Sequence, residues 1–253
     1  MPSPNAAAVL FDMDETLLDN RVNWHDICRE TFAAFSDRLP GVEEGAFLRL
    51  LAQKANDLWN MMFDGAIGGN VGRPYAFINA LRALDADDTL GHAMLEDFET
   101  RMTISTAPAE HAYAVLGALR GAGLRVGIVT NGYVGMQTRK VEHHAFQDHV
   151  DFVLVSEAVG IHKPGRGIFD EALRRADTHA GEAFFVGDNL RADIAGAVGA
   201  GIRSILIDPT GKARKTLAGD PSLPRPTHVI EGLAEVLPIV GLHGGPAWAP
   251  TAS

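Results

Sequence analysis

The stretch Val9-Leu10-Phe11-Asp12-Met13-Asp14-Glu15-Thr16-Leu17 places three apolar residues directly before two acids and a threonine. The apolar run predicts a buried strand. Side chains alternate across a strand, so Asp12 and Asp14 would share one face if the strand continued. Two neighbouring carboxylates are costly unless a cation lies between them or one holds a proton. The stretch therefore indicates either a reactive site at a strand end or a simple capping turn, because short motifs often occur by chance.

The composition is that of an acidic chain with an ordinary apolar content. Its 253 residues are 46% hydrophobic and 21% charged, enough for one large globular domain or two modest ones. The net charge of -10 argues against a non-specific nucleic-acid binder, which needs a basic face. Small anionic substrates stay possible, because a local pocket can be positive. Cys28 is the single cysteine, which excludes an intramolecular disulfide.

The hydropathy pattern predicts a cytoplasmic location. The N-terminal residues include no basic region like that of a signal peptide, and the first apolar run soon meets two aspartates. No apolar stretch reaches the length of a membrane span. We therefore expect no membrane partner, and the sequence does not indicate an oligomeric state.

After Asp19 the pattern changes from strand to helix. Residues 22–104 carry apolar residues at helical spacing. The glycine-rich stretch from Gly65 to Pro74 interrupts them and predicts a loop. From Pro108 onward, strands alternate with helices. Strands are predicted at 125–130, 152–155, 183–187 and 202–207, and helices at 108–121, 137–145, 168–176 and 192–200.

Repeated alternation of this kind predicts an α/β fold, a Rossmann-like parallel sheet with helices on both faces. The expected domains are a core made of residues 1–19 and 105–241, with an inserted all-helical domain at 20–104. The tail 242–253, rich in glycine and proline, is expected to be disordered. Ligands of such sheets bind beyond the carboxyl ends of the strands.

Two of those strand ends carry groups suited to an anion. Thr130-Asn131-Gly132 follows a predicted strand, and a hydroxyl with exposed backbone N–H groups can cradle an anion. The alternative is an ordinary Asn-Gly turn. Lys163-Pro164 is expected to place a cation just before a helix N-terminus, where both favour an anion. The alternative is a solvated lysine.

A third strand end carries acids suited to a metal. Gly187-Asp188-Asn189 follows an apolar strand, and Asp193 comes five residues after Asp188. A carboxylate at a buried strand end suits Mg²⁺, which prefers oxygen ligands. Alternatively, Asp188 or Asn189 is a helix N-cap and Asp193 a first-turn acid. Together, the strand-end residues provide what phosphoryl transfer to a carboxylate requires.

With these motifs the chain resembles the haloacid dehalogenase superfamily. The resemblance rests on Asp12-Met13-Asp14-Glu15-Thr16, Thr130-Asn131-Gly132, Lys163-Pro164 and Gly187-Asp188 to Asp193, and covers about residues 7–210. The helical insert resembles the C1 cap of the family's subfamily I. The residues Thr130-Asn131-Gly132-Tyr133 and Ile161-His162-Lys163-Pro164 resemble those of the family's branch that contains nucleoside monophosphate, sugar phosphate and phosphoglycolate phosphatases.

The resemblance implies a Mg²⁺-dependent phosphatase. Asp12 would be the nucleophile and form an aspartyl-phosphate, and Asp14 would be the general acid and then the general base. Mg²⁺ would be held by Asp12, the backbone carbonyl of Asp14, and Asp188. Asp193 would support the metal or Lys163 from behind.

The resemblance also implies a phosphate-binding set. Thr130 and Lys163 would hold the transferring phosphoryl oxygens, helped by the backbone N–H groups of Met13 and Asn131. Mg²⁺ and Lys163 would offset the repulsion between a carboxylate and an anionic phosphate. The implied partner is a small phosphate ester.

Three other functions stay open. A phosphomutase of the same fold would transfer the phosphoryl group to a second sugar hydroxyl. A haloacid dehalogenase would act without Mg²⁺, and the family's dehalogenases generally lack an acid at the position of Asp14. A non-catalytic binding module would not need Asp12, Asp14 and Asp188. Specificity is expected to lie in the cap, with Arg73 as a possible contact to a distal anion.

Overall fold

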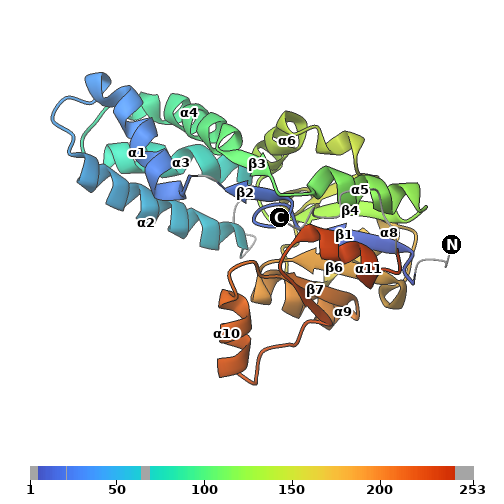
Figure 1. Ribbon diagram of the computed structural model, residues 1–253. Helices are drawn as coiled ribbons and strands as arrows, with labels where there is room; N and C mark the ends of the chain where they lie inside the picture. Colours follow the sequence, from blue (N-terminus) through green and yellow to red (C-terminus); the bar gives the residue numbers. More distant parts are fainter. Residues whose placement is uncertain (1–4, 21, 64–68, 243–253) are drawn as a thin grey trace, which may run out of the picture. The chain divides into compact units, whose positions relative to one another are not determined.

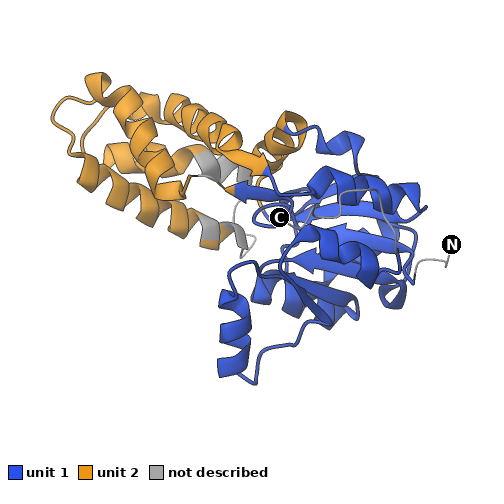
Figure 2. Cartoon of the chain, viewed as in Figure 1, with its two compact units in different colours: residues 1–19, 108–131, 144–253 blue, residues 20–107, 132–143 orange. Residues whose placement is uncertain are grey.

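The computed structural model describes residues 5–20, 22–63 and 69–242, without the side chains of residues 59, 62, 63 and 69–73. The chain divides into two compact units (Figure 2). Unit 1 comprises residues 1–19, 108–131 and 144–253, and unit 2 comprises residues 20–107 and 132–143. Within the described residues, every helix is too short or too polar to span a lipid bilayer.

Unit 1 is built on a six-stranded parallel sheet with the order β5-β4-β1-β6-β7-β8. Figure 1 labels the four central strands, β4, β1, β6 and β7. Its strands are β1 (Ala8–Phe11), β4 (Arg125–Thr130), β5 (Phe152–Val155), β6 (Ala183–Gly187), β7 (Arg203–Ile207) and β8 (His228–Ile230). The Rossmann-like parallel sheet predicted from the sequence is confirmed. β8 was not predicted, because it is only three residues long and its sequence has no extended apolar run; two of the three residues are exposed.

Both faces of this sheet are covered. Leu10 and Phe185 belong to an apolar cluster that includes residues of α8 and α9. Val9 and Phe11, which alternate with Leu10, are equally buried. Since alternate residues of a strand point to opposite faces, the second face must be covered as well. The helices of unit 1 are α5 (Ala112–Gly121), α7 (Ser156–Val159), α8 (Arg166–Arg175), α9 (Gly196–Ala200), α10 (Lys212–Gly219) and α11 (Val236–Ile239).

Unit 2 is a group of helices around an aromatic core. The helices are α1 (Trp24–Phe35), α2 (Glu44–Phe63), α3 (Gly69–Arg82), α4 (Gly91–Ile104) and α6 (Val134–His143). The ring of Phe47 lies 5.2 Å from that of Phe32 and 6.4 Å from that of Phe77, centroid to centroid. Asn23 caps α1 by accepting the N–H of Asp26 at 2.9 Å. β2 (Leu18–Asn20) and β3 (Thr106–Pro108) pair where the chain passes between the units.

Several predicted helix and loop boundaries differ from the structure. Residues 69–74 of the expected loop form the first turns of α3, whereas 65–68 lie outside the described residues. The buried side chains farther along α3, such as Phe77 and Leu81, outweigh the poor helix propensity of glycine and proline. Pro108 ends β3, and α5 begins only at Ala112. The helix expected at 192–200 is a π-helix (Leu190–Ala195) followed by α9, and α8 begins two residues after Pro164.

The grouping of α6 also differs from the alternation pattern. The pattern assigned residues 132–143 to the α/β core, but they cluster with the helices of unit 2, where α6 packs against α4. Arg139 of α6 forms two hydrogen bonds of 2.7 Å each to Glu96 of α4. The predicted tail begins at Leu242, and residues 243–253 lie outside the described residues.

Candidate active site

The order of the strands brings the predicted site residues of unit 1 together. β1 pairs with β4 on one side and with β6 on the other. Phe11, the last residue of β1, is in register with Ile128 and Val186. Asp12 therefore leaves the sheet beside Thr130 and Asp188, because the carboxyl ends of neighbouring parallel strands meet at one edge.

The chain turns sharply after β1 instead of continuing as a strand. The carbonyl of Met13 accepts backbone N–H groups from Leu17 and Leu18, each at 2.9 Å. Glu15 in this turn adopts a left-handed conformation with φ 57°. Asp12 and Asp14 therefore lie in a turn, and strand alternation does not decide which way their side chains point.

Lys163 forms the electrostatic centre of the site. Its Nζ lies 2.7 Å from Asp12 Oδ1 and 2.8 Å from Asp193 Oδ1, and the side chain is 1% exposed. Burial alone would lower the pKa of Lys163, but the charges of Asp12 and Asp193 outweigh it and raise the pKa. The alternative of a solvated lysine is therefore wrong. Pro164 does not open the next helix, because α8 begins at Arg166, three residues after Lys163.

Asn131 holds the backbone of Lys163. Its side-chain Nδ2 donates to the Lys163 carbonyl at 2.9 Å, and the Lys163 N–H donates to Asn131 Oδ1 at 2.8 Å. The alternative that Asn131 only forms an Asn-Gly turn does not account for these bonds. The sequence singled out the Asn131 backbone N–H, and the clamping role of the side chain was missed because its partner is 32 residues away.

Three carboxylates form a compact oxygen cluster. One oxygen each from Asp12, Asp188 and Asp193 lies within 4.8 Å of the others. Among the described residues, the carboxylate of Asp14 is not part of this group. Asp193, expected to support the metal or Lys163 from behind, contributes an oxygen to this group and also lies 2.8 Å from Lys163 Nζ.

The burial of these carboxylates makes their ionisation costly. Burial raises the pKa of Asp12 to about 7, with Asp193 adding to the rise and Lys163 opposing it. Burial also raises the pKa of Asp188 to about 7, helped by Asp193 and Glu15. Glu15 was not among the predicted site residues, although it stands in the same motif. A bound cation would offset this repulsion, and an all-oxygen donor set suits Mg²⁺.

The segment after β6 is shaped around Asp193. Asn189 is the N-cap, because its side chain accepts the N–H groups of Arg191 and Ala192 at 3.0 and 2.9 Å. Its own N–H donates to Asp193 Oδ2 at 3.0 Å. A Cβ on Gly187 would come within 2.4 Å of the same oxygen, so the close approach requires glycine. The N-cap alternative is thus confirmed for Asn189.

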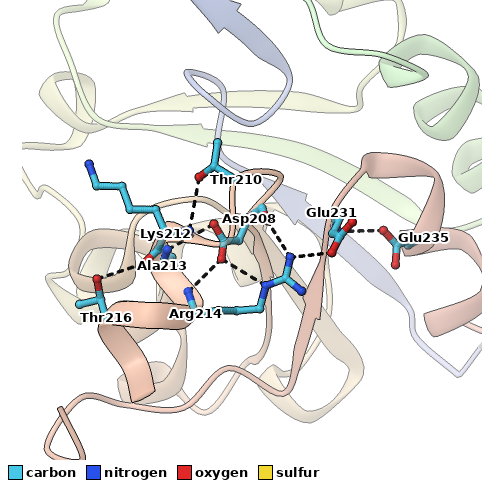
Figure 3. A network of polar contacts seen from close by, with 8 residues as sticks. All are labelled: Asp208, Thr210, Lys212, Ala213, Arg214, Thr216, Glu231 and Glu235. Atoms are coloured by element: carbon cyan, nitrogen blue, oxygen red, sulfur yellow. Dashed lines mark hydrogen bonds and ion pairs between the residues drawn. The ribbon is translucent and has the colours of Figure 1, made fainter. Parts of the chain in front are cut away.

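A polar network beside the site links β7, α10 and β8, and Figure 3 shows its members. Asp208, at the end of β7, accepts the N–H groups of Ala213 and Arg214 at 3.2 and 2.8 Å. Arg214 also donates to the Asp208 carbonyl at 3.0 Å and to Glu231 at 2.8 Å. Burial would raise the pKa of Asp208, but these donors outweigh it and lower the pKa. The sequence did not indicate this network.

The network borders a cavity of about 370 Å³ within unit 1. Glu15 and Asp188 line one part of it, and Thr210 and Lys212 line another. Of the three clustered carboxylates, Asp188 is therefore the one that small molecules can reach from this side. Arg73, the predicted specificity residue, belongs to α3, but its side chain lies outside the described part of the chain, so its role stays a prediction.

Comparison with known proteins gives consistent matches. The model of the haloacid dehalogenase-like hydrolase family matches residues 9–207. A ribulose-1,5-bisphosphate 5-phosphatase of Halopiger xanaduensis is 37% identical over 131 residues, 51% of this chain and 55% of the relative. A pyrimidine 5'-nucleotidase of Escherichia coli is 35% identical over 108 residues, 42% and 48% of the two chains. The matched regions thus span about half the length of these two relatives.

A solved structure extends the comparison to nearly the whole chain. The crystal structure of a 2-haloacid dehalogenase from Pseudomonas syringae pv. Tomato DC3000 superposes with a TM-score of 0.72 at 27% identity. It covers 93% of this chain and 97% of the dehalogenase. The chain is thus similar both to relatives named as a phosphatase and a nucleotidase and to a solved structure of a dehalogenase.

Proposed function

The chain belongs to the haloacid dehalogenase-like hydrolase family, and we propose that it is a Mg²⁺-dependent phosphomonoester hydrolase. Its substrate is a small phosphorylated metabolite of the nucleoside monophosphate, sugar phosphate or phosphoglycolate type. One observation carries the proposal: a buried Lys163 pairs with Asp12 at a strand end beside Asp188, with Asp14 two residues after the proposed nucleophile.

The reaction has two steps at Asp12. A carboxylate oxygen of Asp12 attacks phosphorus, an O–P bond forms, and the bond from phosphorus to the leaving oxygen breaks. Asp14 donates a proton to that oxygen. Asp14 then takes a proton from water, which attacks the aspartyl-phosphate and releases inorganic phosphate with Asp12 restored.

Lys163 and its neighbours provide the charge for both steps. The ammonium lies 2.7 Å from the proposed nucleophile and favours its ionised form. Thr130 and the backbone N–H of Asn131 are proposed to bind the phosphoryl oxygens together with Lys163. The Asn131 side chain keeps Lys163 in place through its two hydrogen bonds.

The acidic cluster is the proposed metal site. Asp12 and Asp188 would hold Mg²⁺ with the backbone carbonyl of Asp14, while Asp193 supports Lys163 and borders the metal. Bound Mg²⁺ supplies positive charge that offsets the repulsion between the nucleophile and the phosphate. The raised pKa values of Asp12 and Asp188 support this assignment, because both carboxylates lack sufficient counter-charge.

The helical segment 20–104 is proposed to be the cap that selects the substrate, with residues 1–19 and 105–241 as the catalytic core. Relatives named as a ribulose-1,5-bisphosphate 5-phosphatase and a pyrimidine 5'-nucleotidase support this class of reaction. The structural similarity to a dehalogenase keeps halide displacement as a second candidate. Asp14 favours the phosphatase, because a departing halide needs no proton, whereas a departing alkoxide does.

The test is release of phosphate from p-nitrophenyl phosphate, with and without EDTA. We expect activity to require Mg²⁺ and to be lost in Asp12→Asn and Asp14→Asn. Asp19→Asn, an exposed acid just past the motif, serves as the matched control. Undiminished activity of Asp12→Asn, or indifference to EDTA, would contradict the mechanism. Chloride release from 2-chloropropionate without Mg²⁺ would favour the dehalogenase, and isomerised sugar phosphate would favour a mutase.

A further inference from the structure

The cavity of about 370 Å³ in unit 1 extends from the proposed metal cluster to a loop that the proposed function leaves unassigned. Every residue that lines it belongs to unit 1. Asp188 borders it after β6, and Thr210 and Lys212 border it between β7 and the first residue of α10. β6 and β7 are neighbouring parallel strands, and α/β proteins bind ligands beyond the carboxyl ends of such strands. The volume is at the low end for small-molecule sites, which favours a compact occupant.

The loop that carries Thr210 and Lys212 is held in place by a buried charge. Asp208, which is 4% exposed, accepts the backbone N–H of Arg214 at 2.8 Å and its guanidinium at 3.3 Å. Between Thr210 and Lys212, Gly211 has φ 72°, a left-handed conformation that favours glycine. Thr210 Oγ accepts the Lys212 N–H at 3.4 Å. The fold itself therefore positions these two side chains, as a binding site on a rigid support requires.

Lys212 contributes a positive charge that the network around Asp208 does not use. Its ammonium forms no ion pair or hydrogen bond in the described part of the chain, and Figure 3 shows the side chain extending away from Asp208 and Arg214. Arg214 pairs with Asp208 at 3.3 Å and with Glu231 at 2.8 Å, so the charge of Asp208 is already offset. Asp208 also occupies N–H groups at the start of α10. An anion here would therefore bind through the Lys212 ammonium and the Thr210 hydroxyl.

The acids of the cavity restrict the rest of the occupant. Glu15 and Asp188 accept hydrogen bonds and would repel a second anion. A molecule with no anion would leave Lys212 without a partner. The occupant should therefore carry one carboxylate together with hydrogen-bond donors at its other end. Mg²⁺ held by Asp188 would repel an ammonium at that end, so hydroxyl groups are the favoured donors.

We propose that the cavity of unit 1 binds a small hydroxycarboxylate, with its carboxylate on the Lys212 ammonium and the Thr210 hydroxyl and its hydroxyl groups toward Glu15 and Asp188. The anion site stands apart from the proposed phosphatase function. Only the choice of hydroxyl over ammonium rests on that function, through the metal at Asp188.

The test is calorimetry of the full chain in MgCl₂ with glycerate, using glycerol and serine as matched probes with the same carbon skeleton. Glycerol lacks the carboxylate, and serine has an ammonium in place of one hydroxyl. We expect glycerate to bind more tightly than either probe. Lys212→Met should raise the Kd of glycerate by about fivefold, and Lys212→Arg should retain part of the affinity.

Lys215→Met is the matched control, because Lys215 is an exposed lysine of α10 that does not line the cavity. This variant removes the same charge and should change the Kd by less than about twofold, since exposed charges outside the cavity are screened. Absence of glycerate binding, or an unchanged Kd in Lys212→Met with Tm retained, would overturn the proposal. So would an equal loss in Lys215→Met, or binding of glycerol or serine as tight as that of glycerate.

A free hydroxycarboxylate and the alcohol part of a phosphorylated one present the same groups to the cavity, and kinetics distinguish these two sources. If the alcohol part of a substrate occupies the cavity, Lys212→Met should lower kcat/KM for 3-phosphoglycerate by about fivefold relative to that for glycerol 3-phosphate. If a free ligand occupies it, the ratio should not change while glycerate binding still depends on Lys212; both results agree with the proposed site. Failure to hydrolyse any phosphate ester would contradict the phosphatase function alone, because calorimetry tests the cavity without catalysis.

Discussion

Replacing Asp193 by asparagine tests whether Lys163 needs both of its carboxylate partners. Asp193 is fully buried and uses both oxygens: Oδ1 faces Lys163 Nζ at 2.8 Å, and Oδ2 accepts the Asn189 N–H at 3.0 Å. An asparagine has the same shape but a single oxygen. Whichever way its amide is turned, an NH₂ group must face one of the two donors.

The expected loss of stability follows from this geometry. Removing one partner of a buried ion pair costs about 3–5 kcal/mol, and leaving a buried donor unsatisfied costs about 1–3 kcal/mol. Asp12 still pairs with Lys163 at 2.7 Å and limits the loss. We therefore expect Asp193→Asn to lower the free energy of unfolding by about 3–5 kcal/mol, because the two penalties overlap. For a protein of this size, that corresponds to a fall in Tm of roughly 6–20 °C.

The assay is urea denaturation of the metal-free protein at pH 8, followed by circular dichroism. Asp170→Asn is the control, because Asp170 is an exposed acid paired with Arg166 at 3.3 Å. Its loss should change stability by no more than about 0.5–1 kcal/mol. If the free energy of unfolding of Asp193→Asn lay within about 0.5 kcal/mol of that of the parent, the reasoning would be refuted, because Asp12 alone would then be a sufficient partner for Lys163.

Three further predictions concern the same site. The pKa of Asp12 in the folded protein is about 7, above its ordinary 3.8, so the folded metal-free protein binds this proton more tightly than the unfolded chain does. The contribution of protonated Asp12 to the free energy of unfolding is therefore fully present below pH 4 and is lost as the pH rises to 7, by at most roughly 4 kcal/mol. The difference between parent and Asp12→Asn should show this loss in denaturation at pH 4–8, and MgCl₂ should diminish it; a pH-independent difference would contradict the burial argument. Gly187→Ala should cost about 1–3 kcal/mol, since the new Cβ would overlap Asp193 Oδ2; an unchanged Tm would mean that the segment shifts freely. Asn131→Ala should lower both Tm and kcat, because two hydrogen bonds to the backbone of Lys163 are lost; the expected fall in the free energy of unfolding is about 1–3 kcal/mol. Asn131→Asp can still accept the Lys163 N–H and should recover part of the loss.

Local patterns in the sequence were sufficient for the sheet strands next to the site. The apolar runs ending at Phe11, Thr130 and Gly187 predicted strands whose ends agree with β1, β4 and β6. Polar residues directly after buried strands also indicated where the site would lie. Such features depend on neighbours in the chain, which is why they can be read without the fold.

Other features of the site depend on partners distant in the sequence. The buried pairing of Lys163 with Asp12 and Asp193, and the clamp from Asn131, join residues many positions apart. A lysine followed by proline is more often solvated, and nothing local indicates its burial. A cavity in unit 2 is likewise lined by residues of α1, α2, α3, α4 and α6 and by Tyr133 just before α6, so its lining could not be inferred from any one segment.

By itself, the sequence determined the class of fold, the strand ends that carry polar groups, and the residue types available for phosphoryl transfer. Those properties follow from hydropathy, alternation and the chemistry of single side chains. Only the tertiary structure decided that β1 lies between β4 and β6, that Lys163 is buried against two carboxylates, and that Asp193 joins Asp12 and Asp188. The physical reason is that strand order and burial come from packing of the whole chain, and burial sets the charge of each site residue.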